Sequence, residues 1–339
     1  MTGTVGFITT KAAPLHAGHI YLCSQAATQV DKLYIVLSHD ADRFADPVLS
    51  LKNRILWLKN TFRDLPHIEV VYVDETGIPK YPNGWEAWAD LVKAKLPAQI
   101  DKIFTSEPKD VKGYNVNFPG SQVVVVDADR RRVPSSGTEI RKEPYKHWSF
   151  MPTMVREQFL KRVCIIGTES TGKSTLTKLL AKHFQTSWVE EYGRTFCETE
   201  LFGDETLLRF DDYGTIAARR WADEQIAVKS ANRVLLADTN ALITNFYCQL
   251  YEGRTNSLVT EYEKLEHYDL VLFLTDDVPW VADGLRINSD RSKTRPLLES
   301  YLTEVKPDYK DRVRFVSGNY QERFNLAVAL IEDLLNEVN

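Results

Sequence analysis

The stretch that most constrains the fold lies in the middle of the chain and reads Gly-Thr-Glu-Ser-Thr-Gly-Lys-Ser, residues 167–174. It follows the apolar run Val163–Ile166 and precedes a helix-forming segment over Ser174–Phe184. Its two glycines let the backbone wrap around an anion, so that N–H groups point inward at the start of the helix. A G-x-x-x-x-G-K-S pattern between a strand and a helix is a phosphate-binding P-loop. The sequence therefore predicts an α/β domain around this loop.

The P-loop also predicts which residues contact a nucleotide. Lys173 should reach the β- and γ-phosphates of ATP, and the Ser174 hydroxyl should bind Mg²⁺. Asp238 ends the apolar run Val234–Ala237, which places a carboxylate beside the phosphates as a second magnesium-organising group. The alternative for Asp238 is a strand-end cap or turn residue. The predicted nucleotide-binding set is Gly167, Thr168, Glu169, Ser170, Thr171, Gly172, Lys173, Ser174 and Thr175.

The residues after the second apolar run of this half favour a small-molecule kinase. Trp188-Val189 is followed by two glutamates, Tyr192 and Arg194. A carboxylate here can accept a proton from a substrate hydroxyl, and Glu191 is the better candidate than Glu190 because it adjoins Tyr192. We expect Tyr192 and Arg194 to bind substrate, although a solvated strand end is the alternative for either glutamate.

A segment near residue 285 has the composition of an arginine-bearing lid. Asp283-Gly284-Leu285-Arg286 is followed by Arg291 and Arg295. Arginine in a lid can neutralise charge on a transferring phosphoryl group, and closure excludes water. Arg286 is the predicted catalytic residue, and a solvated basic loop is the alternative for Arg291 and Arg295.

The N-terminal half carries a second phosphate-handling signature, Pro14-Leu15-His16-Ala17-Gly18-His19. It resembles the H-x-G-H loop of nucleotidylyltransferases. Adenylyl transfer requires alignment of a phosphate with ATP and stabilisation of charge on oxygens, and two histidines at a helix start suit both tasks. Gly18 would let a phosphate approach the backbone. Taken alone, His16 and His19 are also compatible with a metal pair or with plain loop residues.

A matching signature lies about 120 residues further along, at Ser135-Ser136-Gly137-Thr138-Glu139-Ile140-Arg141. It resembles the S-x-T-x-I-R motif of the same enzymes. Ser136, Gly137 and Thr138 at a helix start, with Arg141, can hold the departing pyrophosphate. Trp85 and Trp88 offer flat faces for stacking, and their three-residue spacing equally fits ordinary core aromatics.

Short apolar runs alternate with helical patterns in both halves. The predicted strands are Val5–Thr9, Leu33–Leu37, Ile68–Val73, Lys102–Thr105, Gln122–Val126, Val163–Ile166, Trp188–Glu190, Val234–Ala237, Leu270–Leu274 and Val313–Val316. Such alternation predicts parallel sheets covered on both faces. A last helix over Tyr320–Asn336 should bury Phe324, Val328, Ile331 and Leu335. We predict an α/β protein with two doubly wound parallel-sheet domains: a Rossmann-like nucleotidylyltransferase domain over 1–149, a packed connecting segment over 150–161, and a P-loop kinase domain over 162–339.

Composition and net charge indicate which kinds of partner the protein can bind. The chain has 339 residues, 43% hydrophobic and 26% charged, with a formal net charge of −5, which suits a soluble protein and argues against nucleic-acid binding. The four cysteines lack metal-ligand spacing, so we expect buried, reduced thiols. No signal peptide and no membrane-spanning run are indicated, which predicts a cytoplasmic protein without a membrane partner. The oligomeric state is left open, a homo-oligomer included.

Both halves, in this order, resemble the NadR family, in which nicotinamide mononucleotide (NMN) adenylyltransferase is fused to ribosylnicotinamide kinase. The segments that carry the resemblance are Pro14–His19, Tyr81–Trp85, Thr105–Glu107, Ser136–Arg141, Gly167–Ser174, Glu191–Arg194, Pro279–Arg286 and Tyr320–Phe324. It implies that the second domain phosphorylates nicotinamide riboside with Mg-ATP, and that the first joins NMN to AMP from ATP, giving NAD and pyrophosphate. It further implies that Trp85, and with it Trp88 and Lys11, lies in the substrate site.

Three departures bear on this resemblance. Thr10-Lys11-Ala12 stands where family members usually have Gly-Lys-Phe, and a Cβ at position 10 can obstruct a phosphate. Asp238-Thr239-Asn240 replaces the family's Asp-Thr-Asp. The chain begins at the first strand, so we expect no helix-turn-helix domain. Two alternatives stay open: a coenzyme A synthase-like fusion, and a regulator that binds NAD and ATP with a weak or inactive first site.

Overall fold

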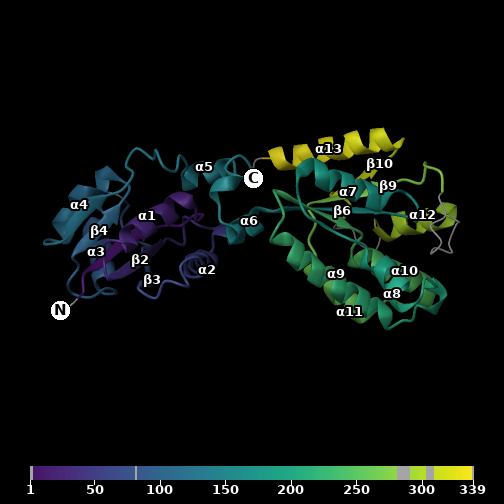
Figure 1. Cartoon of the computed structure of the whole chain (residues 1–339), viewed down its shortest axis with the longest axis horizontal. Helices are drawn as coiled ribbons and strands as arrows, with labels where there is room; N and C mark the ends of the chain where they lie inside the picture. The colour runs from purple at the N-terminus through teal and green to yellow at the C-terminus, as the bar shows by residue number, and fades with distance from the viewer. Residues whose placement is uncertain (1–2, 81, 281–290, 303–308, 338–339) are drawn as a thin grey trace. The chain divides into compact units, whose positions relative to one another are not determined.

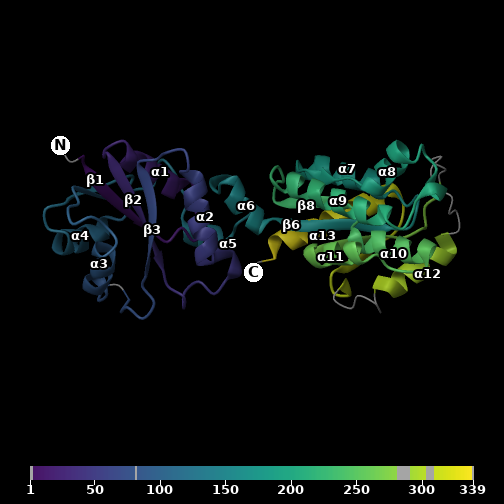
Figure 2. The same cartoon turned by 90° about the horizontal axis from the view of Figure 1, so that it is seen from below.

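The computed structural model describes residues 3–80, 82–280, 291–302 and 309–337. The chain forms two compact units, Met1–Phe159 and Leu160–Asn339, each built on its own sheet (Figures 1 and 2). The division falls inside the predicted connecting segment 150–161. Each unit is described separately below.

The first unit is a five-stranded parallel sheet in the order β3-β2-β1-β4-β5. Its strands are β1 (Val5–Thr10), β2 (Lys32–His39), β3 (Ile68–Asp74), β4 (Lys102–Thr105) and β5 (Gln122–Val125), and its helices are α1 (Ala17–Ala27), α2 (Leu51–Thr61), α3 (Trp85–Lys93), α4 (Val111–Asn117), α5 (Gly137–Lys142) and α6 (Thr153–Phe159). Central strand β1 pairs with β2 on one side and β4 on the other. A ligand crevice is expected where strand order reverses, at the carboxyl ends of β1 and β4.

The second unit is also a five-stranded parallel sheet, in the order β10-β9-β6-β8-β7. Its strands are β6 (Lys161–Gly167), β7 (Trp188–Val189), β8 (Val234–Asp238), β9 (Leu270–Leu274) and β10 (Val313–Val316), and its helices are α7 (Lys173–Phe184), α8 (Tyr192–Glu200), α9 (Asp212–Val228), α10 (Ala241–Glu252), α11 (Ser257–Leu265), α12 (Arg291–Ser300) and α13 (Tyr320–Asn336). Helices α7 and α13 pack against the sheet through one apolar core. Helices α9, α10 and α11 share a second, smaller core.

The predicted fold class is confirmed, because both halves are parallel sheets with interspersed helices. The predicted strands match to within one or two residues at their ends. On α13 the buried line consists of Arg323, Ala327, Ile331 and Leu334, and Phe324, Val328 and Leu335 pack beside it. Of the four predicted residues only Ile331 is fully buried and the other three are partly buried, so the predicted line lies beside the buried one. Arg323 was left out because a charged residue is counted as solvent-facing.

The segment over residues 145–159, which precedes the second sheet, is folded and has buried side chains. Trp148, Met151 and Val155 are buried, and the Tyr145 hydroxyl donates a hydrogen bond to the Phe159 carbonyl at 3.0 Å. The four cysteines are buried and unpaired thiols. Among the described residues, no helix combines the length and apolar character needed to cross a bilayer.

Candidate active sites

The P-loop of the second unit has the predicted shape, and both of its glycines are required. Gly167 and Gly172 have φ values of 150° and 86°, a region that residues with a Cβ rarely adopt. A Cβ on Gly167 would lie 2.7 Å from the Leu274 carbonyl oxygen. Lys173 is buried at the first position of α7, and its Nζ donates to the Thr168 carbonyl at 2.9 Å. The lysine is thus held against the loop where phosphates are expected.

An arginine that the sequence analysis did not select braces this loop. Arg323 of α13 donates to the carbonyls of Gly318, Thr171 and Thr275 at 2.7, 2.8 and 2.9 Å, and pairs with Asp277. Burial alone would raise the pKa of Asp277, but hydrogen bonds from Thr275 and Gly318 and the Arg323 charge lower it to about 2. The only sequence signal for Arg323 was its place in the family-like segment Tyr320–Phe324.

A cavity of about 480 Å³ opens beside the P-loop. Ser174 and Asp238 both line it, so the two predicted magnesium ligands are brought together. A hydroxyl and a carboxylate, completed by phosphate oxygens and water, match the hard oxygen donors that Mg²⁺ prefers. Among the described residues, no group of three or more His, Cys, Asp or Glu side chains could hold a metal by itself. Of the two candidate glutamates, Glu190 is exposed and pairs with Lys178 at 3.1 Å.

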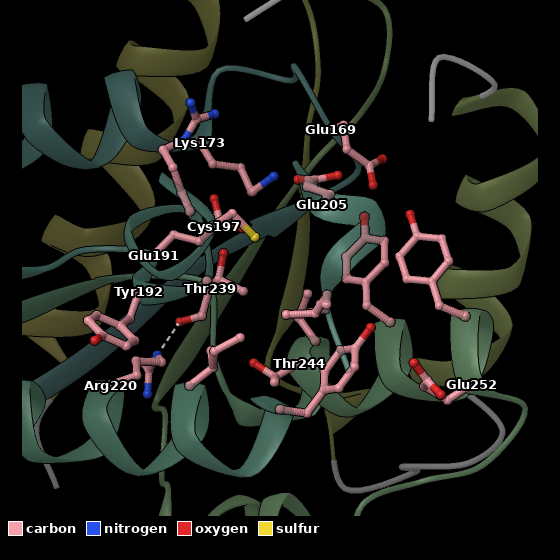
Figure 3. A pocket seen from close by; sticks show the side chains of 18 of the residues that line it. Glu169, Lys173, Glu191, Tyr192, Cys197, Glu205, Arg220, Thr239, Thr244 and Glu252 are labelled. Atoms are coloured by element: carbon pink, nitrogen blue, oxygen red, sulfur yellow. Dashed lines mark hydrogen bonds between the residues drawn. The ribbon is translucent and has the colours of Figure 1, made fainter. Parts of the chain in front are cut away.

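A second cavity, of about 590 Å³, adjoins the first. Lys173, Glu191 and Arg194 line both cavities, which places them where a phosphoryl donor and an acceptor would meet. Figure 3 shows Lys173, Glu191 and Tyr192 among the side chains around this space. Its wall is rich in tyrosines: Tyr192, Tyr213, Tyr247 and Tyr251. We call it the tyrosine cavity. Tyr213, Tyr247 and Tyr251 could not be predicted from sequence, because helices α9 and α10 bring them in from far along the chain.

A buried ionic cluster supports the loop that carries Asp238. Thr239 has a φ of 69°, and its carbonyl accepts a hydrogen bond of 3.0 Å from Arg220 (Figure 3). Arg220 also pairs with Glu224 at 3.1 Å and with Glu266. Burial raises the pKa of Glu266 to about 7, although the Arg220 charge opposes that rise. This cluster fixes a backbone conformation that a residue with a Cβ adopts only under constraint.

The remaining residues predicted for this unit divide into three groups. Ser170, Thr171 and Thr175 line the phosphate cavity, and Glu169 lines the tyrosine cavity. Arg295 is held in ion pairs, at 2.7 Å each, with Asp276 and Glu299. Arg286 and the side chain of Arg291 lie outside the described residues, so their lid role stays a prediction.

In the first unit, the histidines of the H-x-G-H loop cap the helix that follows. Nδ1 of His16 accepts a hydrogen bond from the Gly18 N–H at 3.1 Å, and Nδ1 of His19 accepts one from the His16 N–H at 3.3 Å. The two rings lie 3.8 Å apart. A neutral imidazole that accepts at Nδ1 carries its proton on Nε2. Each ring therefore offers one N–H donor away from the backbone.

Burial keeps both rings neutral. Desolvation, aided by the Arg130 charge, lowers the pKa of His16 to about 4. Desolvation, with the charges of His16 and Arg130, also lowers the pKa of His19 well below its usual value. At neutral pH the pair thus provides hydrogen-bond donors without adding net charge.

The second signature lies against the start of the first. Arg141 of α5 donates a hydrogen bond to the Ala13 carbonyl, 128 residues away in sequence, and to the Thr138 hydroxyl at 3.2 Å. A Cβ on Gly137 would lie 2.9 Å from the same Ala13 carbonyl oxygen. Ser136 caps α5 by accepting from the Glu139 N–H. The two motifs therefore form one site at the edge of the sheet.

The tryptophan pair belongs to an aromatic cluster in the core. Trp85 and Trp88 meet edge to face with centroids 5.4 Å apart, and Trp85 meets Tyr114 in the same way at 5.1 Å. Both tryptophans are only partly buried. The structure thus contains the contacts expected of core aromatics. Because both tryptophans are only partly buried, stacking on a substrate stays a prediction. Lys11 forms an ion pair of 3.3 Å with Glu75.

A third unpredicted arginine holds the segment that departs from the family pattern. Arg54 of α2 is fully buried, and it donates to the carbonyls of Lys11 and Ser38 at 2.9 and 3.1 Å. Its Nη2 lies 2.7 Å from Nδ1 of His39. Ala12 has a φ of 44°, and its N–H donates to the Thr10 hydroxyl at 3.0 Å. The altered residues thus form an ordered turn.

The fold and the two sites define an enzyme with two phosphate-binding units, one of which has a P-loop. Residues 162–323 match a family model described as an AAA domain. The chain is 37% identical to the trifunctional NAD biosynthesis/regulator protein NadR of Escherichia coli (strain K12), over 98% of this chain and 84% of that protein. The chain belongs to the NadR family.

Two solved structures of NadR proteins resemble the whole chain. One, in complex with NR, superposes with a TM-score of 0.80 at 25% identity and covers 98% of this chain and 96% of its own. The other, in complex with NAD and AMP-PNP, has a TM-score of 0.79 at 26% identity and covers 99% and 97%.

Proposed function

We propose that this protein is a bifunctional enzyme of NAD salvage. Its second unit phosphorylates nicotinamide riboside with Mg-ATP to give NMN, and its first unit transfers AMP from a second ATP to NMN, giving NAD and pyrophosphate. The observation that carries the proposal is the pair of cavities in the second unit that share Lys173, Glu191 and Arg194. One cavity fits a triphosphate and the other a nucleoside. The family's NAD biosynthesis and its complexes with NR, NAD and AMP-PNP support the same assignment.

In the kinase unit, the riboside occupies the tyrosine cavity with its 5′-hydroxyl toward the shared residues. Glu191 accepts the proton of that hydroxyl as its oxygen attacks the γ-phosphorus, and ADP leaves. Lys173 and the P-loop amides stabilise charge on the phosphate oxygens. Ser174 and Asp238 are the residues that would hold Mg²⁺, which supplies charge neutralisation on the β- and γ-phosphates. Tyr192 and Arg194 position the acceptor.

In the adenylyltransferase unit, a phosphate oxygen of NMN attacks the α-phosphorus of ATP and pyrophosphate leaves, so no protein nucleophile is needed. His16 and His19 donate from Nε2 to phosphate oxygens, and Gly18 allows the phosphate to approach the backbone. Arg141, with Ser136, Gly137 and Thr138, receives the pyrophosphate. Lys11, Trp85 and Trp88 contact the mononucleotide.

Two variants test the division of labour, with riboside and mononucleotide supplied separately and products identified by mass. Lys173→Ala should abolish phosphorylation of the riboside and leave NAD formation from supplied NMN intact. His19→Ala should do the reverse. Equal loss of both activities in either variant, with the fold retained, would contradict two independent sites. Failure of the parent enzyme to convert either compound would overturn the proposed function itself.

We also propose that the enzyme works in the cytoplasm. Its four buried thiols are unpaired, as expected of a protein kept in a reducing compartment. Fractionation of cells that express the chain is the test. Recovery of the enzyme from a secreted or periplasmic fraction would contradict this location.

A further inference from the structure

The P-loop contains a carboxylate, Glu169, which is an unexpected residue beside bound phosphates because like charges repel. The structure resolves this conflict by the direction of the side chain. Residues 170–175 line the phosphate cavity, whereas Glu169 lines the tyrosine cavity (Figure 3). The P-loop thus directs its backbone toward the phosphate cavity and the Glu169 carboxylate toward the tyrosine cavity.

The Glu169 carboxylate is buried and incompletely satisfied. The residue is 8% exposed, and its Oε2 has no hydrogen-bond partner within the described part of the chain. A buried carboxylate oxygen without a partner is costly. Its position on the wall of a cavity means that a ligand entering the cavity can satisfy it.

The surroundings of Glu169 favour a flat cation. Burial, followed by the Glu169 charge and a hydrogen bond to that carboxylate, raises the pKa of Tyr247, so the tyrosine stays neutral. Tyr247 is stacked on Tyr251 with centroids 5.8 Å apart and an interplanar angle of 19°. Tyrosine faces attract cations through the ring quadrupole. The Glu169 carboxylate and the Tyr247–Tyr251 pair therefore both favour a ligand that carries a positive charge.

We propose that Glu169 determines substrate specificity by recognising a positively charged base, so that the kinase site selects a pyridinium riboside over a riboside with a neutral base. This inference rests on the proposed kinase function and adds the residue that discriminates between substrates. Glu169 takes no part in proton transfer, which is assigned to Glu191. A base with an added carboxylate, as in nicotinic acid riboside, is disfavoured for the same electrostatic reason.

The test compares nicotinamide riboside with benzamide riboside, which keeps the ribose and the carboxamide but has a neutral ring. With the full chain and saturating ATP, we expect nicotinamide riboside to have at least about a tenfold higher kcat/KM, since a carboxylate close to a cation at an effective dielectric constant of about 20 gives ample attraction. Glu169→Gln should remove most of that preference through KM for the cationic substrate. It should lower kcat/KM for benzamide riboside by a smaller factor than for nicotinamide riboside. Glu261→Gln is the matched control, because this exposed glutamate forms an ion pair with Lys264 on the surface of α11, and it should retain the preference.

The role of Glu169 and the proposed kinase function would be refuted by different results. If the parent enzyme phosphorylates both ribosides equally well, or if Glu169→Gln lowers kcat/KM for both by the same factor, Glu169 does not recognise charge. Equal rates in the parent would refute the inference even if Glu169→Gln fails to fold. If the parent phosphorylates neither riboside, the proposed kinase function fails instead.

Discussion

Replacement of Arg323 by alanine tests the brace beneath the P-loop. The Arg323 side chain is 2% exposed, and that of its partner Asp277 is 41% exposed. Hydrogen bonds to a charged group contribute roughly 1.5–3 kcal/mol each but are not additive, and water can hydrate the freed Asp277. The buried carbonyls of Thr171 and Thr275 would lose their donor, and each unsatisfied buried acceptor costs about 1–3 kcal/mol. We therefore expect Arg323→Ala to lower the stability of the second unit by about 3–5 kcal/mol.

Hydrogen exchange followed by mass spectrometry measures this loss for each unit separately. Peptides from 160–339 should show the reduced free energy of opening, while those from 1–159 serve as an internal reference. Arg314→Ala is the matched control, because Arg314 is exposed and its recorded hydrogen bonds are to the nearby carbonyls of Asp311 and Val313. That control should cost less than about 0.5 kcal/mol.

The same substitution should raise KM for ATP in the kinase reaction, because the Thr171 carbonyl of the P-loop loses its donor. Arg323→Lys keeps a positive charge but cannot reproduce the planar fork of donors, and it should fall between the parent and Arg323→Ala. A loss below about 1 kcal/mol, or equal losses in both units, would refute the reasoning.

Two further predictions concern the first unit. Because burial lowers the pKa of His16 to about 4 from an ordinary value of 6.5, protonation favours the unfolded chain. The contribution of neutral His16 to the free energy of unfolding should therefore be complete above pH 6.5 and fall by about 3 kcal/mol as the pH drops toward 4. Urea titrations at several pH values should show a flatter pH dependence for His16→Asn, which retains a helix-capping acceptor, than for the parent. Gly113→Ala should destabilise this unit by about 1–3 kcal/mol and change the near-ultraviolet circular dichroism of Trp85, because the added Cβ would lie 2.3 Å from the indole ring; unchanged spectra and a gain in stability, as at an ordinary helical glycine, would contradict this packing.

Local patterns predicted most of the fold. Apolar runs marked the strands because a strand buried on both faces has few polar positions. Asp238 was predicted to lie beside the P-loop because the carboxyl ends of parallel strands meet at one edge of a sheet, and Ser174 and Asp238 do line the same cavity. The sequence could not decide whether Trp85 stacks on a substrate or packs in the core, since spacing on a helix does not reveal what lies opposite a side chain.

The arginines Arg54, Arg220 and Arg323 were beyond sequence reasoning for a different physical reason. Each is buried, and each binds backbone carbonyls of segments distant in sequence. Every residue type has a backbone carbonyl, so no sequence pattern marks the partner of such an arginine. The direction of the Glu169 side chain was hidden in the same way, because the P-loop pattern specifies the backbone and not where a variable position points.

Arg54 binds the main-chain carbonyl of Lys11 and not its side chain, so this support of the turn after β1 is available to any residue at position 11. The backbone of this turn can therefore keep its course where Thr10 replaces the glycine that family members usually have, as long as the guanidinium remains. Relatives that retain this arginine are expected to accept a residue other than glycine at position 10.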